Sequence, residues 1–162
     1  MKTLVLGLGN PVVQDDAVGL HLARDLRALQ REQGGVEWLP DCSMGGLDLL
    51  ERLVGYDRVI VLDAIRTRGG RPGDWYRFTA AGLRETRHLS SVHDANFATT
   101  LELGRRLGLV LPPDEEIHVF AVEIAVNDAF GEELSETVRA RYPALVDEIG
   151  AEVAALLSRP EA

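Results

Sequence analysis

Apolar residues along the chain follow two kinds of pattern, short continuous runs and repeats at helical spacing. The continuous runs are β-prone and bounded by turn residues, which predicts buried strands at residues 2–7, 58–64 and 117–124. The second run, RVIVLDA, is apolar nearly throughout, as is typical of a strand covered on both faces. Residues 36–40 form another strand candidate, and residues 75–79 are expected to lie at a sheet edge.

Helical spacing occurs between these strands. Residues on one face of a helix recur every three or four positions, as do Val18, Leu22, Leu26 and Leu29. This repeat predicts a helix over about residues 16–33, which the glycines at 34 and 35 would end. Further patterns predict helices over about residues 47–53, 94–107 and 134–157, the last broken or kinked near Pro143.

The alternation of strands and helices predicts an α/β fold, a three-layer α/β/α sandwich with a mostly parallel central sheet. We expect a single domain over residues 1–162, because no linker, repeat or low-complexity tract interrupts the chain. In such sheets, functional sites form at the carboxyl ends of the strands. Three such places are the loop after Gly7, the end of RVIVLDA and the loop before the helix expected at Asp94.

Composition narrows the classes of function. The chain is 46% hydrophobic and 27% charged, which is ordinary for a globular protein in water. Its formal charge of −9, from 26 acidic and 17 basic residues, would repel a nucleic-acid backbone. No apolar stretch is long enough to span a bilayer, and no signal peptide is recognisable at the start. Cys42 is the only cysteine, so no internal disulfide can form, and we expect a cytoplasmic protein without nucleic-acid or membrane partners.

The first candidate site is the loop GLGNPVVQDD at residues 7–16. A dinucleotide fingerprint needs a third glycine where Val12 stands, and a phosphate-binding P-loop needs a lysine that is missing here. The glycines are therefore interpreted as permitting a tight turn. Asp15 and Asp16 stand at the positive end of the helix that follows, where a carboxylate can cap the helix. Capping explains one acid, and the second is a candidate site residue.

Asp63 and His93 are the candidates at the other two places. Asp63 ends the run VIVLDA, where an acid either caps the next turn or belongs to a site. His93, in SSVHDANF, precedes an expected helix and is either a capping residue or a ligand. With Asp16, these residues come from three loops that the fold should gather on one rim. Two carboxylates and an imidazole suit nickel, zinc or another transition metal, and they also suit activation of water for hydrolysis. Cys42 is a weaker candidate, because no activating histidine can be named near it.

Several segments, taken in order, resemble the hydrogenase maturation proteases, which trim the large subunit of nickel–iron hydrogenases. GLGNPVVQDDAVG resembles the opening GxGN…D[ED]xxG of that family, and DCSMGGLDLLE resembles its DGGT-G-DLL segment. VIVLDAI carries its strand-end aspartate, and SVHDANFATTLELGRRLG resembles its segment of a histidine followed by a helix. VFAVEI and GEELSETVRARYPALVDEI resemble its closing strand and helix. The matching features run nearly from end to end in a shared order and spacing.

The resemblance implies both a fold and a site. The fold is an α/β/α sandwich of the phosphorylase/hydrolase-like type. The metal-contacting acid of the family maps to Asp16, its strand-end aspartate to Asp63 and its histidine to His93. The family usually carries glutamate where this chain has Asp16, so the carboxylate is drawn back by one methylene group. The DGGT segment is altered to Asp41-Cys42-Ser43-Met44 and the VExP pattern to Val122-Glu123-Ile124, and the first change lies beside a segment implicated in catalysis or substrate placement.

The resemblance also implies an activity. The substrate would be the precursor of a [NiFe] hydrogenase large subunit that already holds nickel, and an endopeptidase would remove its C-terminal extension. Asp16, Asp63 and His93 would recognise the nickel carried by the substrate, so no permanently bound metal is expected. The cation could polarise the scissile carbonyl or activate water, or a carboxylate, Asp16 or Asp41, could act as general base in an aspartic-type mechanism. A monomer is expected to meet this much larger substrate.

Other functions are weighed against this one. A non-proteolytic nickel or hydrogenase maturation chaperone would keep the metal ligands without cleaving a peptide, and the altered residues 42–44 leave this alternative open. GLGNP also opens the peptidyl-tRNA hydrolases, but Val13-Gln14-Asp15-Asp16-Ala17 stands where those enzymes need a TRHN-like segment. The negative charge also disfavours tRNA. A dinucleotide-binding module is disfavoured by the missing third glycine.

Overall fold

One sheet organises the molecule. The computed structural model describes residues 1–30, 33–85, 92–125 and 129–159, with the backbone alone for residues 84–85 and 92–96. Within these residues the sheet has five strands in the order β2-β1-β3-β5-β4. The strands are β1 (Thr3–Leu8), β2 (Val36–Cys42), β3 (Arg58–Ile65), β4 (Trp75–Thr79) and β5 (Ile117–Glu123). β2, β1, β3 and β5 run parallel, and β4 pairs antiparallel with β5 at the edge, as expected from the sequence.

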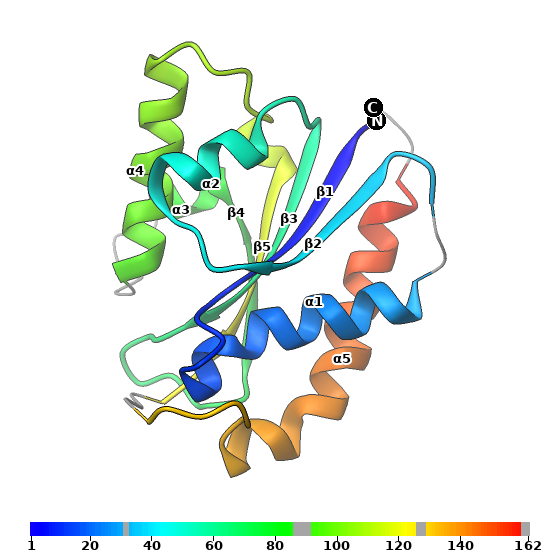
Figure 1. Ribbon diagram of the computed structural model, residues 1–162, viewed down its shortest axis with the longest axis vertical. Coiled ribbons are helices and arrows are strands. Elements are labelled where there is room, and N and C mark those ends of the chain that lie inside the picture. The colour runs from blue at the N-terminus through cyan, green and yellow to red at the C-terminus, as the bar shows by residue number, and fades with distance from the viewer. Residues whose placement is uncertain (31–32, 86–91, 126–128, 160–162) are drawn as a thin grey trace.

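Helices cover both faces of this sheet (Figure 1). α1 (Val18–Leu29) and α5 (Glu136–Leu157) lie on one face, and α2 (Gly46–Leu53), α3 (Ala80–Glu85) and α4 (Val92–Arg106) lie on the other. Short 3-10 turns, η1 (Gln14–Ala17) and η2 (Asp114–Glu116), precede α1 and β5. The predicted three-layer α/β/α sandwich with a mostly parallel sheet is therefore confirmed. No helix in the described ranges is both long and apolar enough to cross a membrane.

The central strands supply a core on each side of the sheet. In β3, Val59 and Val61 pack with α2 and α4, whereas Ile60 and Leu62 pack with α1 and α5. All four side chains are at most 1% exposed. A strand buried on both faces needs apolar residues at successive positions, which is why the run RVIVLDA predicts its own location. Apart from Arg58 at its start, the polar exception in this strand is Asp63, near its end.

Three helices differ from the sequence prediction. α1 is shorter than expected and is preceded by η1, and no side chain caps either of them, so the expectation that Asp15 or Asp16 caps this helix is wrong. α4 begins at Val92, which places the backbone of His93 inside the helix and not in the loop before it. α5 continues through Pro143 without a break. Packing of its buried residues into the core offsets the missing proline hydrogen bond.

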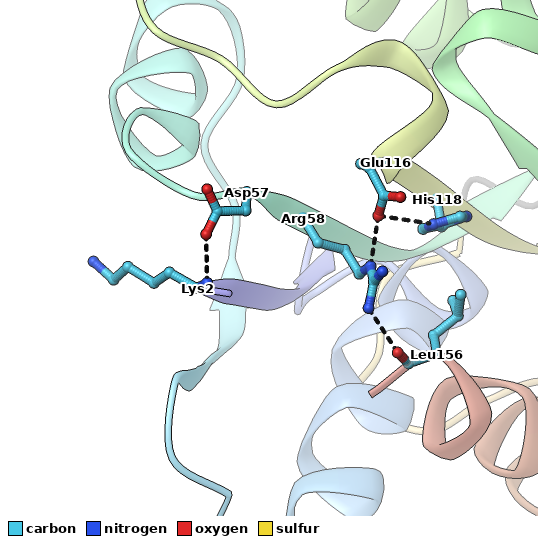
Figure 2. A network of polar contacts seen from close by, with 6 residues as sticks. All are labelled: Lys2, Asp57, Arg58, Glu116, His118 and Leu156. Carbon is cyan, nitrogen blue, oxygen red and sulfur yellow. Dashed lines mark hydrogen bonds and ion pairs between the residues drawn. The ribbon is translucent and has the colours of Figure 1, made fainter. Parts of the chain in front are cut away.

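A polar network closes the amino end of the sheet (Figure 2). Arg58, only 3% exposed, donates from Nε to Glu116 Oε2 at 2.6 Å and from its Nη1 to the carbonyl oxygen of Leu156 at 2.7 Å. The backbone N–H of Lys2 donates to Asp57 Oδ2 at 2.6 Å. These bonds tie β3, η2 and the end of α5 together, because a buried guanidinium must have its donors satisfied. The carboxyl end of the sheet, opposite this network, carries the candidate site.

Candidate active site

The β1–η1 loop positions Asp16 through a tight turn. The backbone N–H of Asn10 donates to Asp16 Oδ2 at 2.8 Å, and Asn10 Oδ1 accepts from the backbone N–H of Val12 at 3.2 Å. The loop folds so closely that a Cβ added to Gly9 would stand 2.2 Å from the carbonyl oxygen of Asp16. Gly9 therefore serves the turn, as interpreted from the sequence, and the backbone of the turn holds the Asp16 carboxylate.

Asp63 reaches the same place from the centre of the sheet. It lies in β3 beside Ala121 of β5, and it is partly buried. Its Oδ1 accepts a hydrogen bond from the backbone N–H of Ala64 at 2.8 Å. Asp16 and Asp63 both line one cavity of about 520 Å³ at the carboxyl end of the sheet. The structure thus brings together two of the three residues that the rim argument selects.

We call this space the site cavity, and its wall is mainly apolar. Its apolar lining side chains are Leu8, Val12, Cys42, Met44, Leu49, Val61, Phe97 and Val119, with Pro11 at the loop. Two carboxylates therefore face an apolar chamber large enough to receive part of a polypeptide. In that chamber a charge contact is less screened by water than it would be at an open surface.

Cys42 lines the site cavity but is an unfavourable nucleophile. Its side chain is fully buried, at 0% exposure. Burial raises the pKa of the thiol, and a hydrogen bond from the Met44 backbone and the positive charge of Arg52 oppose that rise only in part. A raised pKa disfavours the thiolate, which is the reactive form. The residue therefore contributes packing to the cavity wall, in keeping with its weak standing as a sequence candidate.

Asp41 lies apart from the two cavity carboxylates. It is exposed, and its Oδ1 accepts hydrogen bonds from Arg24 of α1, from Nε at 2.8 Å and also from the terminal nitrogen Nη2. α1 covers the face of the sheet opposite to α2, and Asp41 does not line the site cavity. Successive strand residues point to opposite faces, so Cys42 faces the cavity while its neighbour faces α1.

The third predicted ligand, His93, has its backbone in the first turn of α4, and its side chain lies outside the described residues. The same helix contributes Phe97 and Thr100 to the wall of the site cavity. Among the described side chains, no group of three histidine, cysteine, aspartate or glutamate residues is arranged to hold a metal ion. The carboxylate pair is thus the described part of the predicted ligand set.

Sequence reasoning missed several residues of the site. Asn10 fixes Asp16, and its signal was the Asn-Pro pair that marks a turn. Met44 and Phe97 line the cavity but stand in a predicted turn and on the apolar side of a predicted helix, where nothing distinguishes them from packing residues. Glu123, only 2% exposed at the end of β5, repeats the signal of Asp63, an acid that ends an apolar strand, but it does not line the site cavity.

The fold and its carboxylate-lined cavity define the class of protein. Over 96% of its length the chain superimposes on 93% of the hydrogenase maturating endopeptidase HybD from Escherichia coli, with a TM-score of 0.75 and 25% identity. It likewise matches the [NiFe] hydrogenase maturation protease HybD from Thermococcus kodakarensis, with a TM-score of 0.69 and 27% identity over 95% of this chain and 99% of that one. Both are peptide-cleaving maturation enzymes by name.

Sequence comparison supplies the family. The family model described as hydrogenase maturation protease matches residues 20–152, and the chain belongs to that family. The matched range includes Asp41, Asp63 and His93 and begins after Asp16. The hydrogenase 2 maturation protease of Escherichia coli strain K12 is 34% identical over 73 residues, a stretch that covers 45% of this chain and 44% of that protein. The comparisons favour neither a chaperone nor a peptidyl-tRNA hydrolase-like enzyme.

Proposed function

We propose that the protein is an endopeptidase that removes the C-terminal extension of a nickel-loaded [NiFe] hydrogenase large-subunit precursor. One observation carries this proposal, the meeting of Asp16 and Asp63 on a single cavity in a chain of the hydrogenase maturation protease family. Two carboxylates on an apolar chamber can recognise a cation that arrives with a peptide. Cleavage would then depend on completed nickel insertion in the substrate.

In this proposal the carboxylates meet the nickel of the substrate. Asp16 Oδ2 is held by the Asn10 N–H, and its Oδ1 accepts no hydrogen bond from the described residues, so that oxygen can turn to a cation. Asp63 is oriented by the hydrogen bond that its Oδ1 accepts from the Ala64 N–H. His93 would complete the set as the residue that matches the histidine of the family. Nickel enters here as part of the substrate, and the enzyme would hold no resident metal.

Cleavage needs an activated water and a stabilised carbonyl oxygen. Nickel in the substrate could polarise the scissile carbonyl, and a carboxylate could remove a proton from the attacking water. Of the carboxylates considered for this step, Asp16 is favoured over Asp41, since Asp41 is engaged by Arg24 and stands outside the cavity. The mechanism would then be aspartic-type in its base, with nickel supplying recognition.

The decisive experiment is incubation of the purified protein with a nickel-loaded large-subunit precursor and with the same precursor lacking nickel. Intact-mass spectrometry should show loss of one C-terminal peptide from the loaded form alone. Asp16→Asn and Asp63→Asn should each abolish this loss, whereas Asp147→Asn, an exposed change on α5 in the opposite helical layer, should not. A loaded precursor that binds the protein and stays full length would establish a chaperone in place of a protease.

We further propose that the protein acts as a monomer in the cytoplasm. A single cysteine leaves no internal disulfide to gain from an oxidising compartment. Sedimentation velocity of the free protein checks the oligomeric state, and a stable dimer at micromolar concentration would contradict it.

A further inference from the structure

The loop between β3 and β4 is a basic exception in an acidic protein. Residues 66–74, RTRGGRPGD, contain Arg66, Arg68 and Arg71 against one acid, Asp74, whereas the whole chain carries a formal charge of −9. We call this segment the arginine loop. It begins three residues after Asp63 and lies at the same end of the sheet as the β1–η1 loop (Figure 1). None of its residues lines the site cavity, but the loop shares the end of the sheet at which that cavity opens.

The three guanidinium groups of this loop have no ionic partner among the described residues, and they stand within six positions of one another. Seven other arginines in the described ranges pair with carboxylates, as in Arg24–Asp41, Arg58–Glu116, Arg77–Glu152, Arg105–Asp114, Arg106–Glu102, Arg139–Glu133 and Arg141–Glu148. Arg27, Arg52 and Arg159 also lack an ion pair with the described residues, but they stand singly in three separate parts of the chain. Within the described part of the chain, no ion pair or side-chain hydrogen bond engages Arg66, Arg68 or Arg71. Arg68 and Arg71 are exposed and Arg66 is partly exposed. Positive charge is thus concentrated there and left available to a partner.

A buried carboxylate fixes the shape of the arginine loop. Glu123, 2% exposed, accepts at Oε1 from the backbone N–H of Thr67 at 2.8 Å and from its hydroxyl at 2.9 Å. Gly70 crosses so close to this carboxylate that an added Cβ would stand 1.8 Å from Oε1. The turn over Glu123 therefore requires a glycine at position 70. The arginines on either side of this glycine are exposed or partly exposed to solvent.

Backbone bonds secure the far end of the same loop. The N–H of Gly73 donates to the carbonyl oxygen of Glu123 at 2.9 Å, and the N–H of Glu123 donates to the carbonyl oxygen of Asp74 at 2.8 Å. Arg141 of α5 adds a hydrogen bond from Nε to the carbonyl oxygen of Gly73 at 3.2 Å. A loop anchored at both ends loses little conformational entropy when it binds a partner. The arginines are therefore presented from a prepared backbone.

We propose that the arginine loop binds an acidic stretch of the substrate polypeptide. The inference rests on the proposed function for the identity of that polypeptide. Guanidinium groups pair well with carboxylates, because their parallel N–H donors match the two oxygens. An acidic segment that approaches Asp16 and Asp63 meets like charge, and the positive charge of the loop, at the same end of the sheet, offsets this repulsion. Nucleic acid fits this face poorly, since the chain as a whole is negative.

The proposed contact predicts a distinctive kinetic signature. Exposed charges at the rim of a site act mainly on encounter and on binding, and salt screens them. They leave the chemical step at the carboxylates unchanged. Loss of the arginines should therefore raise KM for an acidic substrate without lowering kcat, and the difference from the wild type should shrink as salt is added.

The experiment compares two triple variants of equal charge. Arg66→Gln, Arg68→Gln and Arg71→Gln together remove the positive charge of the loop. Arg27→Gln, Arg52→Gln and Arg159→Gln together remove exposed arginines at the ends of α1, α2 and α5, near the opposite end of the sheet. Each protein is titrated against a fluorescein-labelled oligoglutamate peptide, an oligoglutamine control and a single-stranded DNA of equal charge. KM and kcat are then measured on the nickel-loaded precursor.

We expect the loop variant to bind oligoglutamate about tenfold more weakly and to show a KM about tenfold higher at unchanged kcat, with the control variant within about twofold of the wild type. Equal losses in both triple variants, or wild-type binding and KM in the loop variant, would overturn the inference. So would preferential binding of the DNA. If the wild type binds oligoglutamate through the loop but cleaves no precursor, the proposed function fails and the acidic-peptide surface stands.

Discussion

The carboxylate of Asp15 holds both polar groups of Ser135, which lies 120 residues further along the chain. Oδ1 accepts from the Ser135 backbone N–H at 2.7 Å, and Oδ2 accepts from its hydroxyl at 2.6 Å. Ser135 is the N-cap residue, immediately before α5, and Asp15 is only 2% exposed. Asp15 therefore fastens η1 to the start of α5, while its neighbour Asp16 lines the site cavity. Two adjacent acids that look alike in sequence have separate tasks.

This relationship predicts a stability defect without a catalytic one. Asp15→Ala removes two hydrogen bonds to a carboxylate and leaves the donors of Ser135 unpaired, so the free energy of unfolding should fall by about 2 kcal/mol. Urea denaturation measures the change, and Asp147→Ala should stay within about 0.5 kcal/mol of the wild type. The folded fraction of Asp15→Ala should still shorten the precursor. A variant as stable as the wild type would show that the contact with Ser135 is dispensable.

The rate of precursor cleavage should depend more on the negative charge at position 16 than on the length of that side chain. Asp16→Asn keeps an oxygen for the Asn10 N–H but removes the negative charge, and precursor cleavage should fall at least about 100-fold. Asp16→Glu restores the residue usual in the family and extends the carboxylate into a cavity of about 520 Å³, so cleavage should persist. Single-turnover rates on nickel-loaded precursor compare the two. Equal activity of the asparagine and glutamate variants would remove Asp16 from the mechanism.

Asp41 should contribute much less to precursor cleavage than Asp16 does. Its side chain is 55% exposed and that of Arg24 is 51% exposed, so their ion pair should contribute less than about 1 kcal/mol to the free energy of unfolding. Asp41→Asn should reduce the cleavage rate far less than Asp16→Asn does, because the residue stands outside the site cavity. The same single-turnover assay decides. A loss that matches Asp16→Asn would restore Asp41 as the general base.

The stability of the protein should fall below neutral pH through His118. Burial, followed by the charge of Arg77, lowers the pKa of His118 from 6.5 to about 4, and neither ring nitrogen has a hydrogen-bond partner among the described residues. In the unfolded chain His118 is protonated below about pH 6.5, whereas in the folded protein it is protonated only below about pH 4. Stability is therefore lost as pH falls through that window, by up to about 3 kcal/mol.

His118→Leu isolates this contribution. Urea denaturation at half-unit steps from pH 4 to pH 7 should show a flatter dependence in the variant than in the wild type, because the titrating group is gone. The carboxylates remain in both proteins and supply the common background. Parallel curves for the two proteins would mean that His118 is not the group responsible.

The strands were predictable because their signal is local. A strand buried on both faces must be apolar at successive positions, as RVIVLDA is, and the edge strand β4 occupies the expected residues 75–79. Helix starts were less predictable. The sequence suggested that Asp15 or Asp16 caps α1. Instead, Asp15 accepts hydrogen bonds from Ser135, and Asp16 accepts one from the backbone N–H of Asn10. Pro143 suggested a break in α5, and packing against the core overrides that local preference.

By itself, the sequence determined the order of strands and helices, and through it the placement of Asp16 and Asp63 at one rim, because parallel strands end at the same edge of a sheet. The resemblance to the family assigned Asp16 to the site, but only the tertiary structure decided that Asp15 turns to Ser135 and that Asp41 turns to Arg24 on the other face. Those choices depend on contacts with residues distant in the chain. The local pattern of apolar and polar residues does not indicate which distant residue a carboxylate will contact in the folded protein.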